Sequence, residues 1–188
     1  ISKIRDSKLR KALYRMPGAK STSSWKANAR GVDLNRNYKY NYHAKYGGRR
    51  GGSGYSGPYA ESEPETKAVV KLINTLKKNT KLKGTVNYHA MGSIAFGSVR
   101  RGIKKTTKKT TIKMYNLARK ITGYASSASY ERGGKSVGAL REYTMYNMKV
   151  PSITLEIGVG GCPLPSSQFG SVWRRNYSLV IREARLLG

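Results

Sequence analysis

Two strand-like segments with a helical segment between them constrain the fold of this chain more than any other feature. Residues 85–88 are rich in β-forming residues and end at His89, and residues 152–157 follow Pro151 with alternating, β-branched content. Residues 106–122 carry apolar side chains at helical spacing. Strands that alternate with helices predict an α/β fold, in which a mixed, mostly parallel central sheet is flanked by helices.

Helical periodicity also predicts elements before and after these segments. Residues 62–65 form a capping box with Pro64 in the first turn, and the helix that follows is predicted to run to about Asn79. A shorter helix is predicted over residues 138–147. The last helix is predicted to start near Pro165. Its apolar residues fall on one face: Phe169, Val172, Trp173, Val180 and Ala184.

The length of the chain is most simply that of a single domain over residues 1–188. Residues 1–24 are a basic, irregular segment, in which any short helix would end before Pro17. Residues 47–58 are rich in glycine and predict a flexible loop. Because the chain opens with Ile1 and shows no signal peptide, we expect it to be already processed or a fragment.

The charge of the chain is extreme, with 37 basic and 9 acidic side chains and a net charge of +28. Such a field attracts polyanions, and nucleic acid, an anionic membrane surface and the anionic polymers of a bacterial wall are all candidates. No stretch approaches the ~20 apolar residues of a membrane-spanning helix. A single cysteine, Cys162, excludes an internal disulfide.

Three chemically reactive groups are candidates for a site. Asn35 and Arg36 suit a carboxylate, because the guanidinium offers two parallel N–H groups and the amide one more. His89 and Glu156 lie at or near the carboxyl ends of their predicted strands, where ligands gather in α/β sheets. We therefore expect His89, Glu156 and Arg36 to surround one cleft.

Three blocks in this order resemble the zinc carboxypeptidase family, the M14 metallopeptidases. They are residues 31–37, 87–90 and 153–158, and the resemblance runs from about Trp25 to about Val180. The resemblance implies a carboxypeptidase-like α/β sandwich and metal-assisted amide hydrolysis. It also implies that Asn35 and Arg36 hold a substrate carboxylate, that His89 is a zinc ligand and that Glu156 is the general base.

A second resemblance is to the bacterial branch of this family that cuts peptidoglycan stem peptides. It is carried by residues 25–28, 156–165 and 167–169, which are similar to γ-D-glutamyl-L-diamino acid endopeptidases. This implies a zinc-dependent peptidase for the γ-D-glutamyl–diamino acid bond that acts outside the cell or in the bacterial wall. Two alternatives stay open: a general carboxypeptidase that releases C-terminal residues, or a non-catalytic basic module that binds wall polymer or, less expected, nucleic acid.

The family resemblance gives three further residues a role. Lys26 stands where the family often has an arginine that stabilises the oxyanion, although lysine is a point charge without the fork. Arg141 lies in the region that lines the pocket for the residue after the cleaved bond, where a cation favours an acidic substrate. Tyr130 lies slightly before the place of the family's mobile tyrosine. The plainer alternatives are a solvated lysine and a helix-surface arginine.

The zinc site that the resemblance implies is incomplete in this sequence. The family supplies its other two protein ligands from a His-x-x-Glu motif upstream of the Asn-Arg pair, and this motif is absent. The second histidine, His43, lies on the wrong side of the pair and is expected to be exposed. Since catalytic zinc uses three protein ligands, we expect either a chain without its N-terminal part, completed by a separate N-terminal chain, or a degenerate relative that binds without cutting. The retained Glu156 favours the first explanation.

Overall fold

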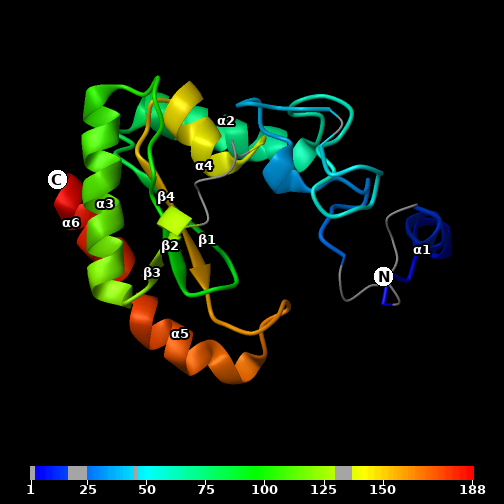
Figure 1. Cartoon of the computed structure of the whole chain (residues 1–188). Coiled ribbons are helices and arrows are strands. Elements are labelled where there is room, and N and C mark those ends of the chain that lie inside the picture. Colours follow the sequence, from blue (N-terminus) through cyan, green and yellow to red (C-terminus); the bar gives the residue numbers. More distant parts are fainter. Residues whose placement is uncertain (1–2, 17–24, 45, 130–136) are drawn as a thin grey trace. The chain divides into compact units, whose positions relative to one another are not determined.

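The structure is a computed structural model of the chain and describes residues 3–16, 25–44, 46–129 and 137–188 (Figure 1). The chain forms two compact units. The first comprises residues 1–81 and 135–143, and the second comprises residues 82–134 and 144–188. The prediction of a single domain stays a prediction.

The first unit consists of short helices joined by turns. Helix α1 (Ser7–Tyr14) begins at Asp6, whose carboxylate accepts the N–H groups of Lys8 and Leu9 at 2.8 and 2.9 Å. A 3₁₀ turn, η1 (Leu34–Arg36), and helix α4 (Leu140–Glu142) are the other short elements. Helix α2 (Pro64–Asn79) is the long one and ends where the sequence predicts.

The capping box predicted over residues 62–65 is wrong. No side chain caps α2, although Pro64 does occupy its first turn. Ser62 Oγ donates instead to Glu63 Oε1 at 2.6 Å, and Glu63 Oε2 accepts from Asn28 Nδ2 at 2.7 Å. Both residues are buried, so they connect α2 to the segment before η1 rather than closing the helix end.

The second unit is built on a four-stranded sheet with the order β1-β4-β2-β3 (Figure 1). The strands are β1 (Thr85–Ala90), β2 (Ile94–Phe96), β3 (Ala125–Ser126) and β4 (Ser152–Ile157). β1 runs parallel to β4 and β2 parallel to β3, whereas β2 and β4 are antiparallel. The prediction of a mixed, mostly parallel sheet is therefore confirmed.

Helix α3 (Lys105–Thr122) packs against β2 and β4, and helices α5 (Phe169–Asn176) and α6 (Leu179–Leu187) pack against α3. The core between them contains Met114 of α3, Leu155 of β4 and Leu179 of α6, all with at most 1% exposure. The predicted helix over residues 106–122 is thus confirmed. No helix among the described residues has the length and apolar character that crossing a membrane requires.

Two predictions for the C-terminal part need correction. The single last helix is a 3₁₀ turn, η4 (Ser166–Gln168), followed by α5 and α6. Most of its predicted apolar face is exposed: Phe169, Trp173, Val180 and Ala184. The helix predicted over residues 138–147 is α4 followed by a π-helical turn, η3 (Tyr143–Asn147).

Candidate active site

His89 and Glu156 are partners in the parallel register of β1 and β4. Each is the last residue but one of its strand, so both lie at the carboxyl ends of the strands. Because side chains alternate in step along paired strands, the imidazole and the carboxylate lie on the same face of the sheet. Both residues are half-buried. The structure therefore brings the predicted metal ligand and the predicted base together.

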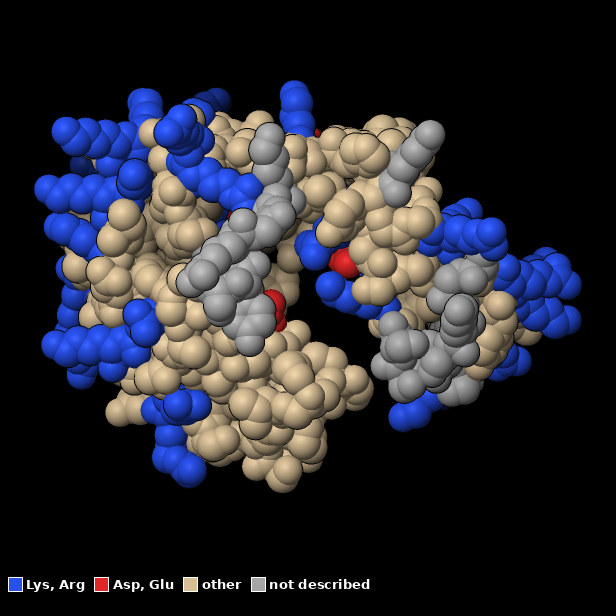
Figure 2. All heavy atoms as spheres, in the orientation of Figure 1, with Lys and Arg blue, Asp and Glu red and all other residues tan. Residues whose placement is uncertain are grey.

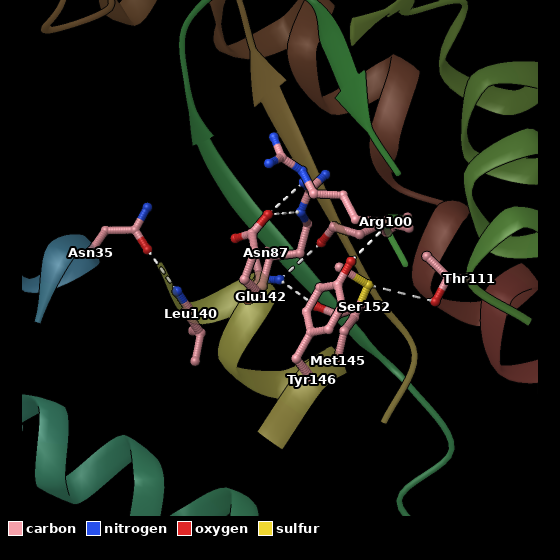
Figure 3. A network of polar contacts seen from close by, with 11 residues as sticks. Asn35, Asn87, Arg100, Thr111, Leu140, Glu142, Met145, Tyr146 and Ser152 are labelled. Atoms are coloured by element: carbon pink, nitrogen blue, oxygen red, sulfur yellow. Dashed lines mark hydrogen bonds and ion pairs between the residues drawn. The ribbon is translucent and has the colours of Figure 1, made fainter. Parts of the chain in front are cut away.

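The face that carries this pair is polar along its whole length. Asn87 Nδ2 donates to Ser152 Oγ and to the Ile153 carbonyl, both at 2.9 Å (Figure 3). Thr85 Oγ1 and Ser152 Oγ are 2.7 Å apart. The other face of β4 carries Ile153 and Leu155, which are fully buried in the core. The alternation seen in the sequence thus separates a reactive face from a packing face.

Glu156 lies in the interior of the sheet, since its strand pairs with β1 on one side and β2 on the other. Ile94 of β2 is its antiparallel partner. Gly92 precedes this strand with φ +146°, and a Cβ there would lie 2.9 Å from Ile94 Cδ1 and 3.9 Å from Glu156 Cβ. Glycine therefore leaves room beside the base of the Glu156 side chain that a larger residue would fill.

Two hydrogen bonds fix the loop that follows β4, starting three residues after Glu156. Val159 N–H donates to Gln168 Oε1 at 3.0 Å, and Gln168 Nε2 donates back to the Val159 carbonyl at 2.8 Å. Gly158 has φ +65°, and a Cβ there would lie 2.6 Å from Leu164 Cδ1. This turn requires glycine, which explains the Gly158 of the sequence block around the predicted base.

The Asn-Arg pair lies in the first unit, at the η1 turn. Asp33 caps the turn by accepting the Asn35 N–H at 3.1 Å. Asn35 Oδ1 accepts the Leu140 N–H at 3.0 Å, across 105 residues of sequence (Figure 3). Since this contact uses the amide oxygen, the Asn35 amide nitrogen is oriented as a donor. That is the role a carboxylate clamp needs.

Both the guanidinium and the backbone of Arg36 have close contacts within the same unit. Its Nη1 donates to the Asn35 carbonyl at 2.7 Å, and its guanidinium lies 5.8 Å from the ring centre of Tyr46. Arg36 Nε is buried and has no hydrogen-bond partner among the described residues. Gly138, with φ +53°, packs so closely on the Arg36 carbonyl that a Cβ would collide with it. Because Nη1 is engaged and Nε is buried, Nη2 is the guanidinium nitrogen that we expect to donate to an anion.

Lys26 and Arg141 are cations that already have carboxylate partners. Lys26 Nζ lies 3.3 Å from Asp33 Oδ2, and the lysine side chain is 56% exposed. Arg141 Nε and Nη2 lie 2.9 and 2.5 Å from Glu142 Oε1, with both side chains buried. Balanced charges attract an external anion less strongly than free ones. The roles predicted for Lys26 and Arg141 stay predictions, and Tyr130 lies outside the described residues.

The candidate residues thus form two groups. His89 and Glu156 are in the second unit, whereas Asn35, Arg36 and Arg141 are in the first. In the second unit the two residues share one face of the sheet, and in the first unit Asn35 and Arg36 are adjacent in the η1 turn. The prediction that both groups share one cleft stays a prediction.

The described residues do not offer a complete zinc site. Among them, no group of three His, Cys, Asp or Glu residues could hold a metal ion. His43 is exposed, as predicted. His89 therefore fits the part of one zinc ligand, and the residues present do not fit a zinc ion by themselves, because catalytic zinc uses three protein ligands.

Sequence reasoning missed the residue that organises the first unit. Asn37 is fully buried, and its Nδ2 lies 2.8 Å from the Ser56 carbonyl and 3.0 Å from Ser62 Oγ. Next to it, Tyr38 packs on Tyr143 with ring centres 5.7 Å apart. Burial, with the Glu61 carboxylate nearby, raises the pKa of Tyr38 to about 12. The signal was present in the sequence, since Asn37 directly follows the Asn-Arg pair.

Residues 11–179 match the zinc carboxypeptidase family. The chain is 22% identical over 162 residues to gamma-D-glutamyl-L-diamino acid endopeptidase 1 of Lysinibacillus sphaericus. The matched residues make up 85% of this chain and 38% of the relative. The resemblance inferred from the sequence motifs is therefore confirmed, and zinc is the cofactor that this family implies.

Solved structures share the fold. Bovine thrombin-activatable fibrinolysis inhibitor, in a complex with tick carboxypeptidase inhibitor, superposes with a TM-score of 0.67 at 20% identity, covering 83% of this chain and 56% of that chain. Murein-tripeptide amidase MpaA of Escherichia coli O157 gives 0.53 at 20% identity, covering 86% and 60%. The carboxypeptidase-like fold is thus shown, and the chain spans about two fifths of the curated relative it matches.

Proposed function

Because this chain belongs to the zinc carboxypeptidase family, we propose that it is a metallopeptidase that hydrolyses the γ-D-glutamyl–diamino acid bond of peptidoglycan stem peptides. The observation that carries the proposal is the register pairing of His89 with Glu156 at the carboxyl ends of two parallel strands. An imidazole beside a carboxylate suits a metal ligand beside a general base. The name of the curated relative, an endopeptidase for this bond, supports the choice of substrate.

The candidate residues have different roles in the proposed reaction. Glu156 takes a proton from the attacking water and returns it to the leaving amine of the diamino acid. Asn35 and Arg36 hold a free carboxylate of the substrate through the donors that their contacts leave available. A bound zinc ion would supply a water of lowered pKa and a Lewis acid for the scissile carbonyl. His89 would supply one of its ligands, and we propose that the others come from a segment outside these 188 residues, in the same or a separate chain.

The proposed substrate places the protein at the bacterial wall, outside the cell. Its net charge of +28 supports this location, because wall polymers are anionic. Lys26 and Arg141 enter the proposal only as candidates for the oxyanion and the acidic substrate group. Tyr130 is a candidate for substrate contact.

The test is hydrolysis of a stem peptide, L-Ala-γ-D-Glu-diaminopimelate, followed by mass spectrometry of the released dipeptide and diamino acid. The longest product of the gene should be assayed with zinc present, beside this chain alone. Glu156→Gln should lower the rate of dipeptide release by at least about 10²-fold, which is the usual contribution of a general base. Thr154→Val, two residues away on the same face, should leave most of the activity. Unchanged turnover in Glu156→Gln would exclude Glu156 as the base.

Zinc content provides a separate readout. In the longest product of the gene, His89→Ala should lower the zinc bound per protein after dialysis, whereas His43→Ala, at an exposed histidine, should not. Equal zinc content in His89→Ala and the unmodified protein would remove His89 from the site. This measurement does not depend on any substrate.

The second candidate function is that of a general carboxypeptidase. The Asn35–Arg36 clamp favours it, since any C-terminal carboxylate has the same chemistry as the one in a stem peptide. Linear peptides with a free or an amidated C-terminus distinguish the two. Release of C-terminal residues from the free peptide, without cleavage of the stem peptide, would replace the endopeptidase proposal.

A further inference from the structure

Helix α3 presents a face rich in lysine to solvent. Its 18 residues include no acidic side chain. Five lysines, which we call the α3 lysine face, are exposed: Lys105, Lys108, Lys109, Lys113 and Lys120. The buried residues occupy the opposite side of the helix: Thr107, Thr111, Met114, Ala118 and Thr122. Figure 2 shows Lys and Arg side chains gathered over this part of the molecule.

The described residues of the second unit offer few carboxylates to balance the α3 lysine face. The carboxylate side chains among its described residues are those of Glu156 and Glu183. Glu183 is 2% exposed, and Glu156 lies on the sheet face turned away from the core that α3 covers. No ion pair of a described residue involves α3. Arg119 is set apart, because its Nε donates to the Tyr124 carbonyl at 3.3 Å.

This arrangement costs helix stability. Lys105 and Lys109, and Lys109 and Lys113, are like charges four residues apart, and each such pair destabilises a helix. Lys105 and Lys108 also stand in the first turn, where the helix dipole favours anions. No side chain caps this end. Local rules are broken in this way mainly where function requires it.

The spacing and chemistry of the face suit a flexible chain of phosphates. Lys105, Lys109 and Lys113 are separated by about 6 Å along the helix, from its rise of 1.5 Å per residue. An ammonium on a long stem is a point charge with rotatable donors, so it can donate hydrogen bonds to phosphates in many positions. Such a face binds charge without reading a fixed geometry.

Nucleic acid and membrane fit the face less well. Single-stranded nucleic acid sites combine cations with aromatic side chains on which bases stack. The aromatic residue of α3, Tyr115, is half-buried and lies under the Arg119 guanidinium at 5.6 Å. A membrane-surface helix needs an apolar face to insert, and Ile112, at 39% exposure, is the exposed large hydrophobic residue of α3.

From these observations we infer that the α3 lysine face binds a wall polymer of the poly(glycerol phosphate) type. This inference rests on the proposed function for the presence of the wall. α3 packs on the apolar side of β4, whereas His89 and Glu156 lie on the polar side. The polymer would therefore hold the protein on the wall while leaving the peptidase face open.

The test measures binding of deacylated lipoteichoic acid with a poly(glycerol phosphate) backbone, between 50 and 300 mM salt. The triple variant Lys105→Gln, Lys109→Gln, Lys113→Gln should weaken binding by at least about tenfold and lower the salt slope by about two, at roughly 0.7 per lost phosphate contact. The matched control, Lys67→Gln, Lys71→Gln, Lys78→Gln, removes the same charge from exposed lysines of α2. It should change the affinity less than about threefold.

Three results would overturn the inference. They are no binding of the unmodified protein, equal losses in both triple variants, and tighter binding of a single-stranded DNA of equal charge that falls with the α3 variant. Circular dichroism should show both variants folded, since glutamine favours helix about as well as lysine. Hydrolysis of the soluble stem peptide should not change in the α3 variant, so the two proposals can fail separately.

Discussion

Helices α3 and α6 belong to the same unit and pack on one another, yet their exposed side chains differ. α3 buries small and apolar residues and exposes lysines, as a surface helix should. α6 buries Leu179 and Glu183 and exposes Val180, Ile181 and Leu186 at 57%, 59% and 39%. Burial raises the pKa of Glu183 to about 8. The outward side of α3 is suited to water, whereas that of α6 is suited to a contact.

Exposed aromatic residues in and directly after α5 add to the apolar surface of α6. Phe169 stacks on Trp173 with ring centres 6.1 Å apart, and Trp173 lies 6.4 Å from Tyr177. All three are more than half exposed. The surface of α5 and α6 thus joins aromatic and aliphatic side chains, and the following variants test how far it differs from α3.

The largest expected effect separates the two sides of α6. Leu179→Ala removes a fully buried side chain and should lower the free energy of unfolding by about 2–5 kcal/mol, because it leaves a cavity. Leu186→Ala, on the exposed side, should cost less than about 1 kcal/mol. Urea denaturation measures both. Equal losses would show that α6 packs through its other side.

The next effect concerns the buried carboxyl group. The folded pKa of Glu183 is about 8, above the unfolded value of 4.5, so unfolding releases its proton and stability falls as pH rises from 4.5 to 8. Glu183→Gln should therefore raise the melting temperature by several degrees at pH 8 and change it little at pH 4.5. Glu65→Gln, an exposed carboxyl on α2, is the control. A gain that does not depend on pH would mean that Glu183 is ionised in the folded state.

A smaller effect is expected on the exposed apolar side chains. Val180→Lys with Ile181→Lys should reduce binding of the dye ANS and reduce aggregation at neutral pH, with less than about 0.5 kcal/mol per site in stability. Ile112→Lys on α3 should leave dye binding unchanged, because that residue is surrounded by lysines. Equal dye binding by all three proteins would remove the contrast between the helices.

The smallest effect tests the electrostatic cost of α3. Lys105→Glu places an anion in the first turn and opposite Lys109, so it should stabilise the protein by about 0.5 kcal/mol. The same change should weaken poly(glycerol phosphate) binding. Loss of stability would show that Lys105 has a structural role that its exposure does not reveal.

The sequence predicted the sheet better than it predicted the contacts of α6. His89 and Glu156 stand at the ends of two segments with strong strand signals, so their pairing follows once the sheet is parallel. In α6, Leu179 and Leu187 lie beside a second apolar set, Val180 and Ile181, and periodicity alone cannot decide which set faces the core. The structure selects the set that includes Glu183.

Other features could not be predicted because they depend on distant contacts or on very short elements. β2 and β3 have three and two residues, too few for a periodic pattern. The bond from Leu140 N–H to Asn35 Oδ1 joins segments 105 residues apart. Only the fold brings these atoms together, whereas the prediction that Asn35 and Arg36 bind a carboxylate comes from the two residue types alone.

The order of the strands has a consequence for how firmly each reactive group is held. Glu156 sits in a strand with a hydrogen-bonded neighbour on both sides, whereas the strand of His89 stands at one end of the order. Amide protons near the imidazole should exchange with solvent sooner than those near the carboxylate. Local opening of the sheet would therefore displace His89 before Glu156, and the stability of β1 would limit how long the two side chains stay together.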